Sequence, residues 1–316
     1  MATNTLPDTF FQQLVAKYET AKGDHHILFN GESAVHELIS VPTGSSTINY
    51  QITLLKSLMH RPDQGSKDKN PFANPEPELT ILANYKDEFK IVFNKYPVVD
   101  YHFMLVTNEF RPQSSPLTPL ELSATYEVLQ ALKTQDTGRD WVGFYNSGDE
   151  SGASQPHKHI QFMSLPSDFV PYSKSLCDSY TEEGYIPINT IVERYPLQDG
   201  NIPFAHFLAK FPTDIDEEGL ALSFAALLQR TLTVLRENQA TSISYNFIMT
   251  TEYMMMIPRR SSKYKQIGIN SCGVLGLILC KNEELLDLVK SDGCLEVTKG
   301  VCFENTSGKA ETDYDY

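Results

Sequence analysis

Two histidines and a glutamine stand at alternate positions near the end of residues 146–161, NSGDESGASQPHKHIQ. Alternate side chains of a β-strand share one face, so His157, His159 and Gln161 are predicted to point the same way. A neutral imidazole offers a nitrogen lone pair near pH 7, which makes histidine a suitable nucleophile toward phosphorus. These three residues are therefore candidates for chemistry on a phosphate group.

A turn of small residues precedes the histidines and is suited to holding an anion. Gly152, Ala153, Ser154 and Gln155 leave backbone N–H groups open to close approach by a phosphate. H-x-H alone is more often part of a polar edge strand that happens to contain two histidines. H-x-H-x-Q directly after a Gly-Ala-Ser-Gln turn is more specific, and it favours catalysis.

Other well-known signatures are absent from the sequence. It contains no P-loop, no G-x-G-x-x-G, no G-x-S-x-G and no C-x-x-C pair. His36-Glu37 begins like a zinc-protease helix, but Ser40 stands where the second histidine should be. No metal site is predicted, and four histidines without a partner at ligand spacing are assigned no role: His25, His26, His60 and His206.

The charge balance excludes broad classes of partner. The 316 residues include 26 basic and 40 acidic ones, a net charge of -14, which disfavours binding to nucleic acid or to anionic lipid. The N-terminus lacks the features of a signal peptide, and the apolar run 273–280 is too short to cross a bilayer. Five cysteines without a paired spacing fit free thiols in a reducing compartment. We expect a protein of the cytosol or nucleus.

The elements that must position these residues alternate between helix and strand. Thr118, Pro119 and Glu121 form a capping box that starts a strong helix over 118–135. Periodicity predicts further helices over 7–22, 216–238 and 282–290, and strands over 89–97, 101–107, 141–146, 157–165, 243–250, 253–258 and 274–281. Four prolines predict a long surface loop over 60–78, and the polar tail after Glu304 is expected to fray.

This order of elements predicts an α+β fold with a largely antiparallel sheet and flanking helices. The second half of the chain repeats the pattern of the first. No change in composition marks a linker, so we predict two repeated halves in one compact unit: residues 1–170 with the H-x-H-x-Q motif and residues 171–316 completing the sheet and the substrate pocket.

The motif resembles the histidine-triad (HIT) superfamily, whose nucleotidyltransferase branch has H-x-H-x-Q. FNKYPVVDYHFMLV resembles the nucleoside-binding hairpin of that superfamily, with Pro97 and His102 at the usual separation. Nearly the whole chain is similar to the fungal diadenosine tetraphosphate (Ap4A) phosphorylases, or ATP adenylyltransferases. The matching segments are NPFANPEPEL, NKYPVV, SGASQPHKHIQ, FAHF, YNFIMTTEYMMMIPRR and INSCGVLGLILCK.

The resemblance implies a HIT-like fold and a reversible transfer in which Ap4A and phosphate give ATP and ADP. His159 would be the nucleophile that forms an adenylyl-histidine, and His157 would orient its ring through the backbone carbonyl. Gln161 can only hydrogen-bond the phosphoryl oxygens, so it favours transfer over hydrolysis. Mg²⁺, bound mainly through substrate phosphates, is the expected cation, and a monomer is expected because two halves occur in one chain.

The same resemblance assigns substrate contacts. They are Asn94, Lys95, Asn146, Gly152, Ala153, Ser154, Gln155, Asn270, Ser271 and Lys281. Three further contacts depart from the family pattern: Arg61 replaces Lys, Cys272 replaces Thr and Leu277 replaces Met. Lys158 alternates away from the histidines and is predicted to be an exposed strand lysine. The run Arg259, Arg260, Lys263 and Lys265 fits substrate binding and a solvated turn equally well.

Two alternatives remain at this point. A sugar-1-phosphate or other nucleotide-sugar nucleotidyltransferase shares H-x-H-x-Q, although HPH is usual there and this chain has HKH. A nucleotide-binding sensor without turnover is the other, and the intact nucleophile, glutamine and small-residue turn disfavour it.

Overall fold

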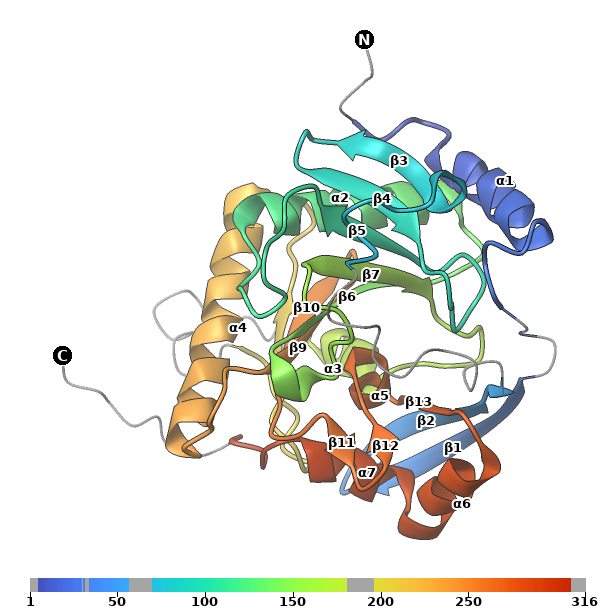
Figure 1. Cartoon of the computed structure of the whole chain (residues 1–316). Coiled ribbons are helices and arrows are strands. Elements are labelled where there is room, and N and C mark those ends of the chain that lie inside the picture. The colour runs from blue at the N-terminus through green and yellow to red at the C-terminus, as the bar shows by residue number, and fades with distance from the viewer. Residues whose placement is uncertain (1–4, 30, 32–33, 57–69, 181–195, 308–316) are drawn as a thin grey trace.

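The structure is a computed structural model, and it describes residues 5–29, 31, 34–56, 70–180 and 196–307. A large sheet runs in the order β3-β4-β5-β7-β6-β9-β10-β8 (Figure 1). All its neighbouring strands are antiparallel, which confirms the predicted α+β class. The strands are β3 (Thr80–Tyr85), β4 (Phe89–Phe93), β5 (Phe103–Thr107), β6 (Trp141–Ser147), β7 (His159–Ser164), β8 (Phe207–Lys210), β9 (Tyr245–Met249) and β10 (Tyr253–Pro258).

Six of the eight strands of the large sheet form two copies of one β-α-β-β unit, as the repeated sequence pattern predicts. β5, α2 (Pro119–Gln135), β6 and β7 are followed by β8, α4 (Glu217–Glu237), β9 and β10 in the same order. β6 pairs with β9 at the centre, with Asn146 opposite Asn246. The last two strands are joined by the long segment 148–158 in the first copy and by the short turn 250–252 in the second. Only the first copy therefore carries the Gly-Ala-Ser-Gln turn and the H-x-H-x-Q motif.

Helices α1 (Phe10–Gly23), α2 and α4 cover one face of the large sheet (Figure 1). The helix predicted over 7–22 is confirmed as α1, and its buried side chains include Phe10, Leu14 and Tyr18. The capping box of α2 is confirmed, because Glu121 N–H donates to Thr118 Oγ1 at 3.3 Å and Thr118 N–H donates to the Glu121 carboxylate at 2.7 Å.

The opposite face packs against a smaller layer. Its sheet joins β1 (Val35–Thr43) to β2 (Ser46–Leu54) in antiparallel fashion and β2 to β13 (Leu277–Cys280) in parallel. The helices α3 (Tyr172–Ser179), α5 (Ser271–Leu275), α6 (Glu283–Asp292) and α7 (Cys294–Val301) complete this layer. Its apolar core includes Ile52 of β2, Phe144 and Met163 of the large sheet, and Ile278 of β13. A separate hairpin, β11 (Lys263–Tyr264) and β12 (Ile267–Gly268), lies beside α7.

The sequence analysis and the structure differ at three places. The strand predicted over 274–281 is wrong in its first part, because Asn270 Oδ1 accepts the backbone N–H of Cys272 and Gly273 and so starts α5. Only 277–280 is strand. The hairpin of β1 and β2 and the helices α3 and α7 were not predicted. Of the loop predicted over 60–78, residues 60–69 lie outside the described residues, and Pro77–Leu79 forms a short 3-10 helix, η3.

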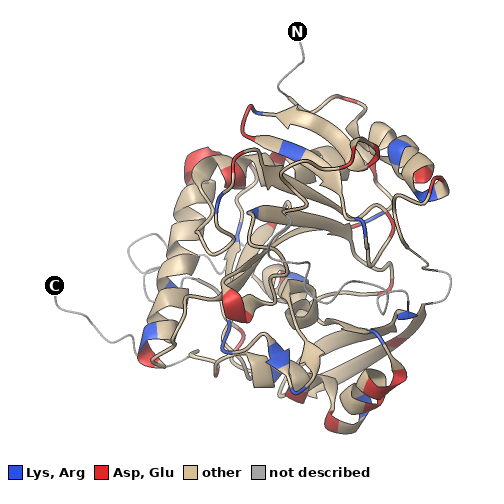
Figure 2. Ribbon diagram, viewed as in Figure 1, with Lys and Arg blue, Asp and Glu red and all other residues tan. Residues whose placement is uncertain are grey.

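Acidic side chains lie on the outer helices. Figure 2 shows Asp and Glu on α1, α4 and α6, consistent with the net charge of -14. Within the described part of the chain, no helix combines the length and the apolar character needed to cross a membrane.

Candidate active site

His159 begins β7 near the centre of the large sheet, and its side chain is buried. Because Ile160 and Phe162 belong to the helix-covered core, His159 and Gln161 point to the opposite face. The His159 Nδ1 lies 2.8 Å from the His157 carbonyl oxygen. The ring N–H is therefore on Nδ1, and the lone pair on Nε2 is the nucleophilic one.

His157 lies just before β7, in an isolated bridge with Pro112. Its Nε2 lies 2.8 Å from the Thr107 carbonyl oxygen, and its Nδ1 lies 2.8 Å from the Asn70 amide nitrogen. The Nε2–H therefore donates to Thr107, and Nδ1 accepts from Asn70, so the ring is neutral. Burial lowers the pKa of His157, which favours the same neutral form. The ring is a fixed support for the carbonyl that orients His159.

The segment 70–72 packs against both imidazoles. The Phe72 ring centroid lies 5.0 Å from that of His159 and 6.0 Å from that of His157. Lys90 Nζ donates to the Phe72 carbonyl oxygen at 2.9 Å and holds this segment on the sheet. The NPF part of the NPFANPEPEL segment thus supports the two histidines directly.

Gln161 is oriented by His102. The two side chains meet at 3.1 Å between His102 Nε2 and Gln161 Oε1. Asn94 Nδ2 lies 3.5 Å from His102 Nδ1, so His102 carries its proton on Nε2 and donates to the glutamine. With its oxygen turned to His102, Gln161 has its amide N–H groups available as donors toward a phosphate.

Three hydrogen bonds from two residues fix the side chain of Asn146 near the end of β6. Its Oδ1 accepts from Asn246 Nδ2 at 2.8 Å, from Ser271 N–H at 2.9 Å and from the Ser271 hydroxyl at 2.7 Å. This identifies Oδ1 and Nδ2 by their partners and orients Nδ2 away from that cluster. The structure thereby brings together the predicted contacts Asn146 and Ser271. Asn270, the predicted contact next to Ser271, uses its side-chain oxygen as the N-cap of α5.

The turn of small residues is held in shape by glycine and by Arg259. Gly152 has a φ of 81°, and a Cβ added there would lie 2.6 Å from the Ile269 carbonyl oxygen, so only glycine fits. The Ser151 carbonyl accepts from Asn246 Nδ2 at 2.9 Å and from Arg259 at 3.3 Å. Ala153 and Gln155 are half-buried and Ser154 is exposed, so this turn lies at the surface between β6 and β7.

The hairpin predicted from the strands at 89–97 and 101–107 is present as the antiparallel pair of β4 and β5, although both strands are shorter than expected. Asn94 and Lys95 follow β4 in the connection. Asn94 Oδ1 accepts from Tyr96 N–H at 3.0 Å, and Lys95 Nζ lies 2.5 Å from the Glu76 carboxylate. Both predicted contacts are therefore in the loop beside His102, and Lys95 already has a carboxylate partner.

The remaining predicted contacts are more scattered. Cys272 lies in α5, with its Sγ 3.4 Å from Met163 Sδ, and burial raises the pKa of its thiol to about 12. Leu277 begins β13 and packs against the core of the smaller layer. Lys281 is exposed directly after β13. Arg61 lies outside the described residues.

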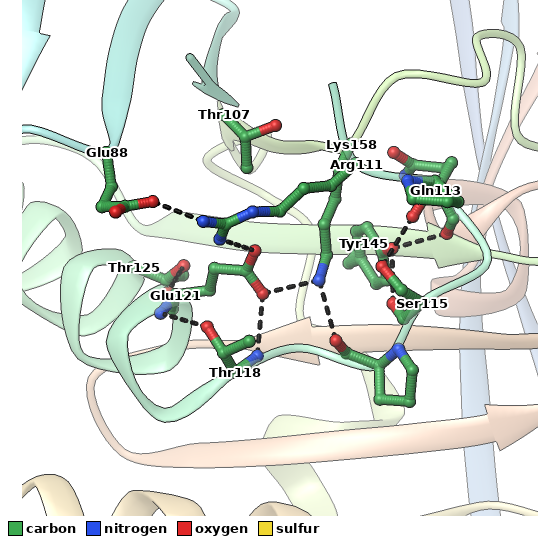
Figure 3. Close-up of polar contacts among 12 residues, drawn as sticks. Glu88, Thr107, Arg111, Gln113, Ser115, Thr118, Glu121, Thr125, Tyr145 and Lys158 are labelled. Carbon is green, nitrogen blue, oxygen red and sulfur yellow. Dashed lines mark hydrogen bonds and ion pairs between the residues drawn. The ribbon is translucent and has the colours of Figure 1, made fainter. Parts of the chain in front are cut away.

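The prediction that Lys158 is an exposed lysine is wrong. Its side chain is 2% exposed, and its Nζ lies 2.6 Å from the carboxylate of Glu121, which is 1% exposed (Figure 3). Nζ also donates to the Pro116 carbonyl oxygen at 2.7 Å. The alternation away from His157 and His159 was right, but the face opposite the histidines is covered by the start of α2.

The basic run also divides in the structure. Arg259 is buried and donates to the carbonyl oxygens of Val301, Ser261 and Ile269 as well as to the turn, so it is a structural residue. Arg260 and Lys263 are exposed, and Lys265 pairs with Asp292. These three fit the solvated turn.

Sequence reasoning missed three residues that hold the site: Gln113, which contacts the backbone of His159, and the orienting groups His102 and Asn246. His102 stood within the recognised hairpin. Gln113 lies in an irregular segment, RPQSSP, where neither periodicity nor a motif marks it.

Two protein-family models match the chain: the Ap4A phosphorylase N-terminal domain over residues 38–176 and the ATP adenylyltransferase C-terminal domain over residues 200–304. Diadenosine 5',5'''-P1,P4-tetraphosphate phosphorylase 2 of Saccharomyces cerevisiae is 35% identical, over 96% of this chain and 98% of that protein. Protein APA1 of the same yeast is 35% identical, over 86% of this chain and 88% of that protein.

Solved structures agree with the sequence relatives. The crystal structure of yeast Ap4A phosphorylase Apa2 in complex with Ap4A gives a TM-score of 0.81 at 32% identity, covering 96% of this chain and all of that one. The complex of the same enzyme with AMP gives 0.82, covering 97% of this chain. These relatives do not favour the nucleotide-sugar alternative. The chain belongs to the Ap4A phosphorylase family of nucleotidyltransferases, whose second domain is named for ATP adenylyltransferase.

Proposed function

We propose that this chain phosphorolyses Ap4A: Ap4A and phosphate give ATP and ADP, through an adenylyl group carried on His159 Nε2. The main support for this proposal is the 2.8 Å contact between His159 Nδ1 and the His157 carbonyl oxygen. Because the ring N–H is on Nδ1, the nucleophilic lone pair is on Nε2. The yeast relatives named as Ap4A phosphorylases support the choice of substrate.

The reaction follows as two in-line displacements at one phosphorus. His159 Nε2 attacks the α-phosphorus of one adenosine; the N–P bond forms, the bond to the bridging oxygen breaks, and ATP leaves. Because Nδ1 keeps its proton, the adenylylated ring is cationic, and the His157 carbonyl stabilises that charge. A phosphate oxygen then attacks the same phosphorus, the N–P bond breaks, and ADP leaves with His159 restored.

Gln161 and Asn146 act on the phosphoryl oxygens. Each is an uncharged amide whose oxygen is already engaged, by His102 and by Asn246 and Ser271 respectively, and whose N–H groups can donate. Neither residue can take a proton from water at neutral pH, so the intermediate has no protein base for hydrolysis at these two positions. The backbone of 152–155 would hold the phosphates of the substrate, and Lys95 and Lys281 would add positive charge.

A divalent cation, Mg²⁺, would neutralise the polyphosphate. Among the described residues, His26, Glu76 and Glu78 have ligand atoms within 4.8 Å of one another. Glu76 already bridges Lys95 and His26, so that group does not fit a resident ion, and a cation held through substrate phosphates fits better. We further propose that the chain works as a monomer, since both copies of the repeated β-α-β-β unit occur in this one chain.

Product analysis tests the reaction. Purified protein is incubated with Ap4A in the presence and absence of phosphate, and the nucleotides are separated by ion-exchange chromatography. ATP and ADP should form only with phosphate, and His159→Ala should form neither. Turnover without phosphate would show hydrolysis and contradict the role given to Gln161.

A further inference from the structure

The strands β6 and β7 separate at the nucleophile. Their register runs from Trp141 opposite Ser164 to Phe144 opposite Gln161, where the pairing stops. Two residues further along each strand, Asn146 and His159 would face each other. They do not pair, and the buried side chain of Gln113 lies between their backbones.

The side-chain amide of Gln113 takes the place of the missing backbone hydrogen bonds between Asn146 and His159. Its Oε1 accepts the backbone N–H of His159 at 2.8 Å. Its Nε2 donates to the His159 carbonyl oxygen at 3.2 Å and to the Asn146 carbonyl oxygen at 2.9 Å. A separated strand pair normally leaves buried backbone groups without hydrogen-bond partners, which destabilises the fold. The glutamine amide satisfies these groups while keeping the strands apart.

Gln113 is itself held on both sides. Its backbone N–H donates to the Pro156 carbonyl oxygen at 2.8 Å, directly before the H-x-H segment. The Tyr145 hydroxyl lies 2.5 Å from the Gln113 carbonyl oxygen and 2.9 Å from that of Ser115 (Figure 3). Gln113 is therefore anchored to β6, to Pro156 at the end of the turn of small residues, and to His159.

We propose that Gln113 is a positioning residue for the transfer reaction: it acts as a wedge that sets the backbone of His159 relative to Asn146 and opens the space for the phosphates. This inference rests on the proposed function for its catalytic consequence. Displacing a nucleophile by about 1 Å can slow a reaction by about 100-fold. Loss of the wedge should therefore slow attack on phosphorus more than it weakens substrate binding.

The test compares Gln113→Met, which keeps the volume but makes none of the three bonds, with Gln113→Glu, which keeps the acceptor for His159 N–H. Ser114→Ala, at the exposed neighbouring position, is the matched control. Single-turnover adenylylation by radiolabelled Ap4A and steady-state kinetics are measured, together with hydrogen exchange of the His159 backbone amide.

Gln113→Met should lower the adenylylation rate and kcat by about 10- to 100-fold while KM changes by less than about threefold. Gln113→Glu should fall between it and the wild type, and exchange at His159 should quicken in Gln113→Met while the rest of β7 stays protected. A folded Gln113→Met protein with wild-type adenylylation would overturn the inference. If the wild type forms no adenylyl-enzyme, the proposed function fails. The positioning role of Gln113 is then tested by exchange alone, and exchange at His159 that is unchanged in Gln113→Met would overturn it.

Discussion

Lys158, the residue between the two histidines of the motif, forms a buried ion pair with Glu121 at 2.6 Å on the face of the sheet opposite the proposed nucleophile. Glu121 also accepts from Thr118 N–H in the capping box of α2 (Figure 3). Burial lowers the pKa of Lys158, and the hydrogen bond to Glu121 opposes that shift. The pair therefore joins the catalytic segment to the start of a helix on the other side.

Breaking this pair should destabilise the fold strongly. Lys158→Met leaves the Glu121 carboxylate buried with less compensation, so the free energy of unfolding should fall by about 3–5 kcal/mol, measured by urea denaturation. Adding Glu121→Gln should recover part of the loss. Lys299→Met removes an exposed partner of Glu296 and should change stability by less than about 1 kcal/mol. An equally small effect for Lys158→Met would show that the buried pair contributes little.

Gln161→His should add hydrolysis to the phosphorolytic reaction. A histidine at this position can act as a general base for water, which an amide cannot. The variant should release AMP from Ap4A without phosphate, at a rate well above that of the wild type. Nucleotide analysis in phosphate-free buffer measures this. Absence of AMP would mean that position 161 does not control the choice of acceptor.

Asn146→Asp should weaken binding of the phosphates. The substitution keeps the acceptor that Asn246 and Ser271 use, but it places a negative oxygen where Nδ2 can donate. KM for Ap4A should rise by about 10- to 100-fold, as expected for a lost hydrogen bond plus charge repulsion. Asn246→Asp, one step further from the phosphates, is the comparison. A KM unchanged in Asn146→Asp would remove this residue from the substrate site.

Acid should destabilise the fold through His206. Its Nδ1 lies 2.8 Å from the Phe204 carbonyl oxygen, and its Nε2 accepts from Asp199 N–H at 2.9 Å, so the folded state holds the ring neutral. Burial lowers the pKa of His206. Since its unfolded pKa is near 6.5, the unfolded state binds more protons just below that pH, and stability is lost as pH falls from 6.5 through the lower folded pKa.

The Tm measured by calorimetry between pH 7 and pH 5 should therefore decrease on acidification, and His206→Gln should flatten that dependence. The exposed His25 gives a control, because His25→Gln should leave the slope as it is. A His206→Gln slope equal to that of the wild type would assign the acid sensitivity to other groups. His157, whose pKa burial also lowers, is the second candidate.

The fold was predictable where periodicity and capping are local. The capping box at Thr118 and the alternation around His159 both correspond to real elements. The two failures differ in cause. The Asn270 cap is a local contact, but the helix that it starts has only five residues and runs into β13 within one apolar segment. Lys158 is buried because α2 presents Glu121 to it, and sequence spacing does not reveal that contact.

From the residues alone, the sequence points only to candidates within one motif. His157, His159 and Gln161 stand close together in the chain, whereas Ser271, which the family resemblance assigns, meets Asn146 across 125 positions. Gln113 acts through its side-chain amide on backbone atoms, and such contacts leave no periodic signal. Long-range contacts of this kind need the folded chain to reveal them.

Trapping the covalent intermediate tests the central claim most directly. Protein incubated with Ap4A labelled in the adenosine α-phosphate, without phosphate, should release ATP and retain an acid-labile adenylyl group on His159, located by mass spectrometry. Adding phosphate should then release the label as ADP, and His159→Ala should retain none. Label on another residue, or phosphorolysis by His159→Ala, would contradict the account.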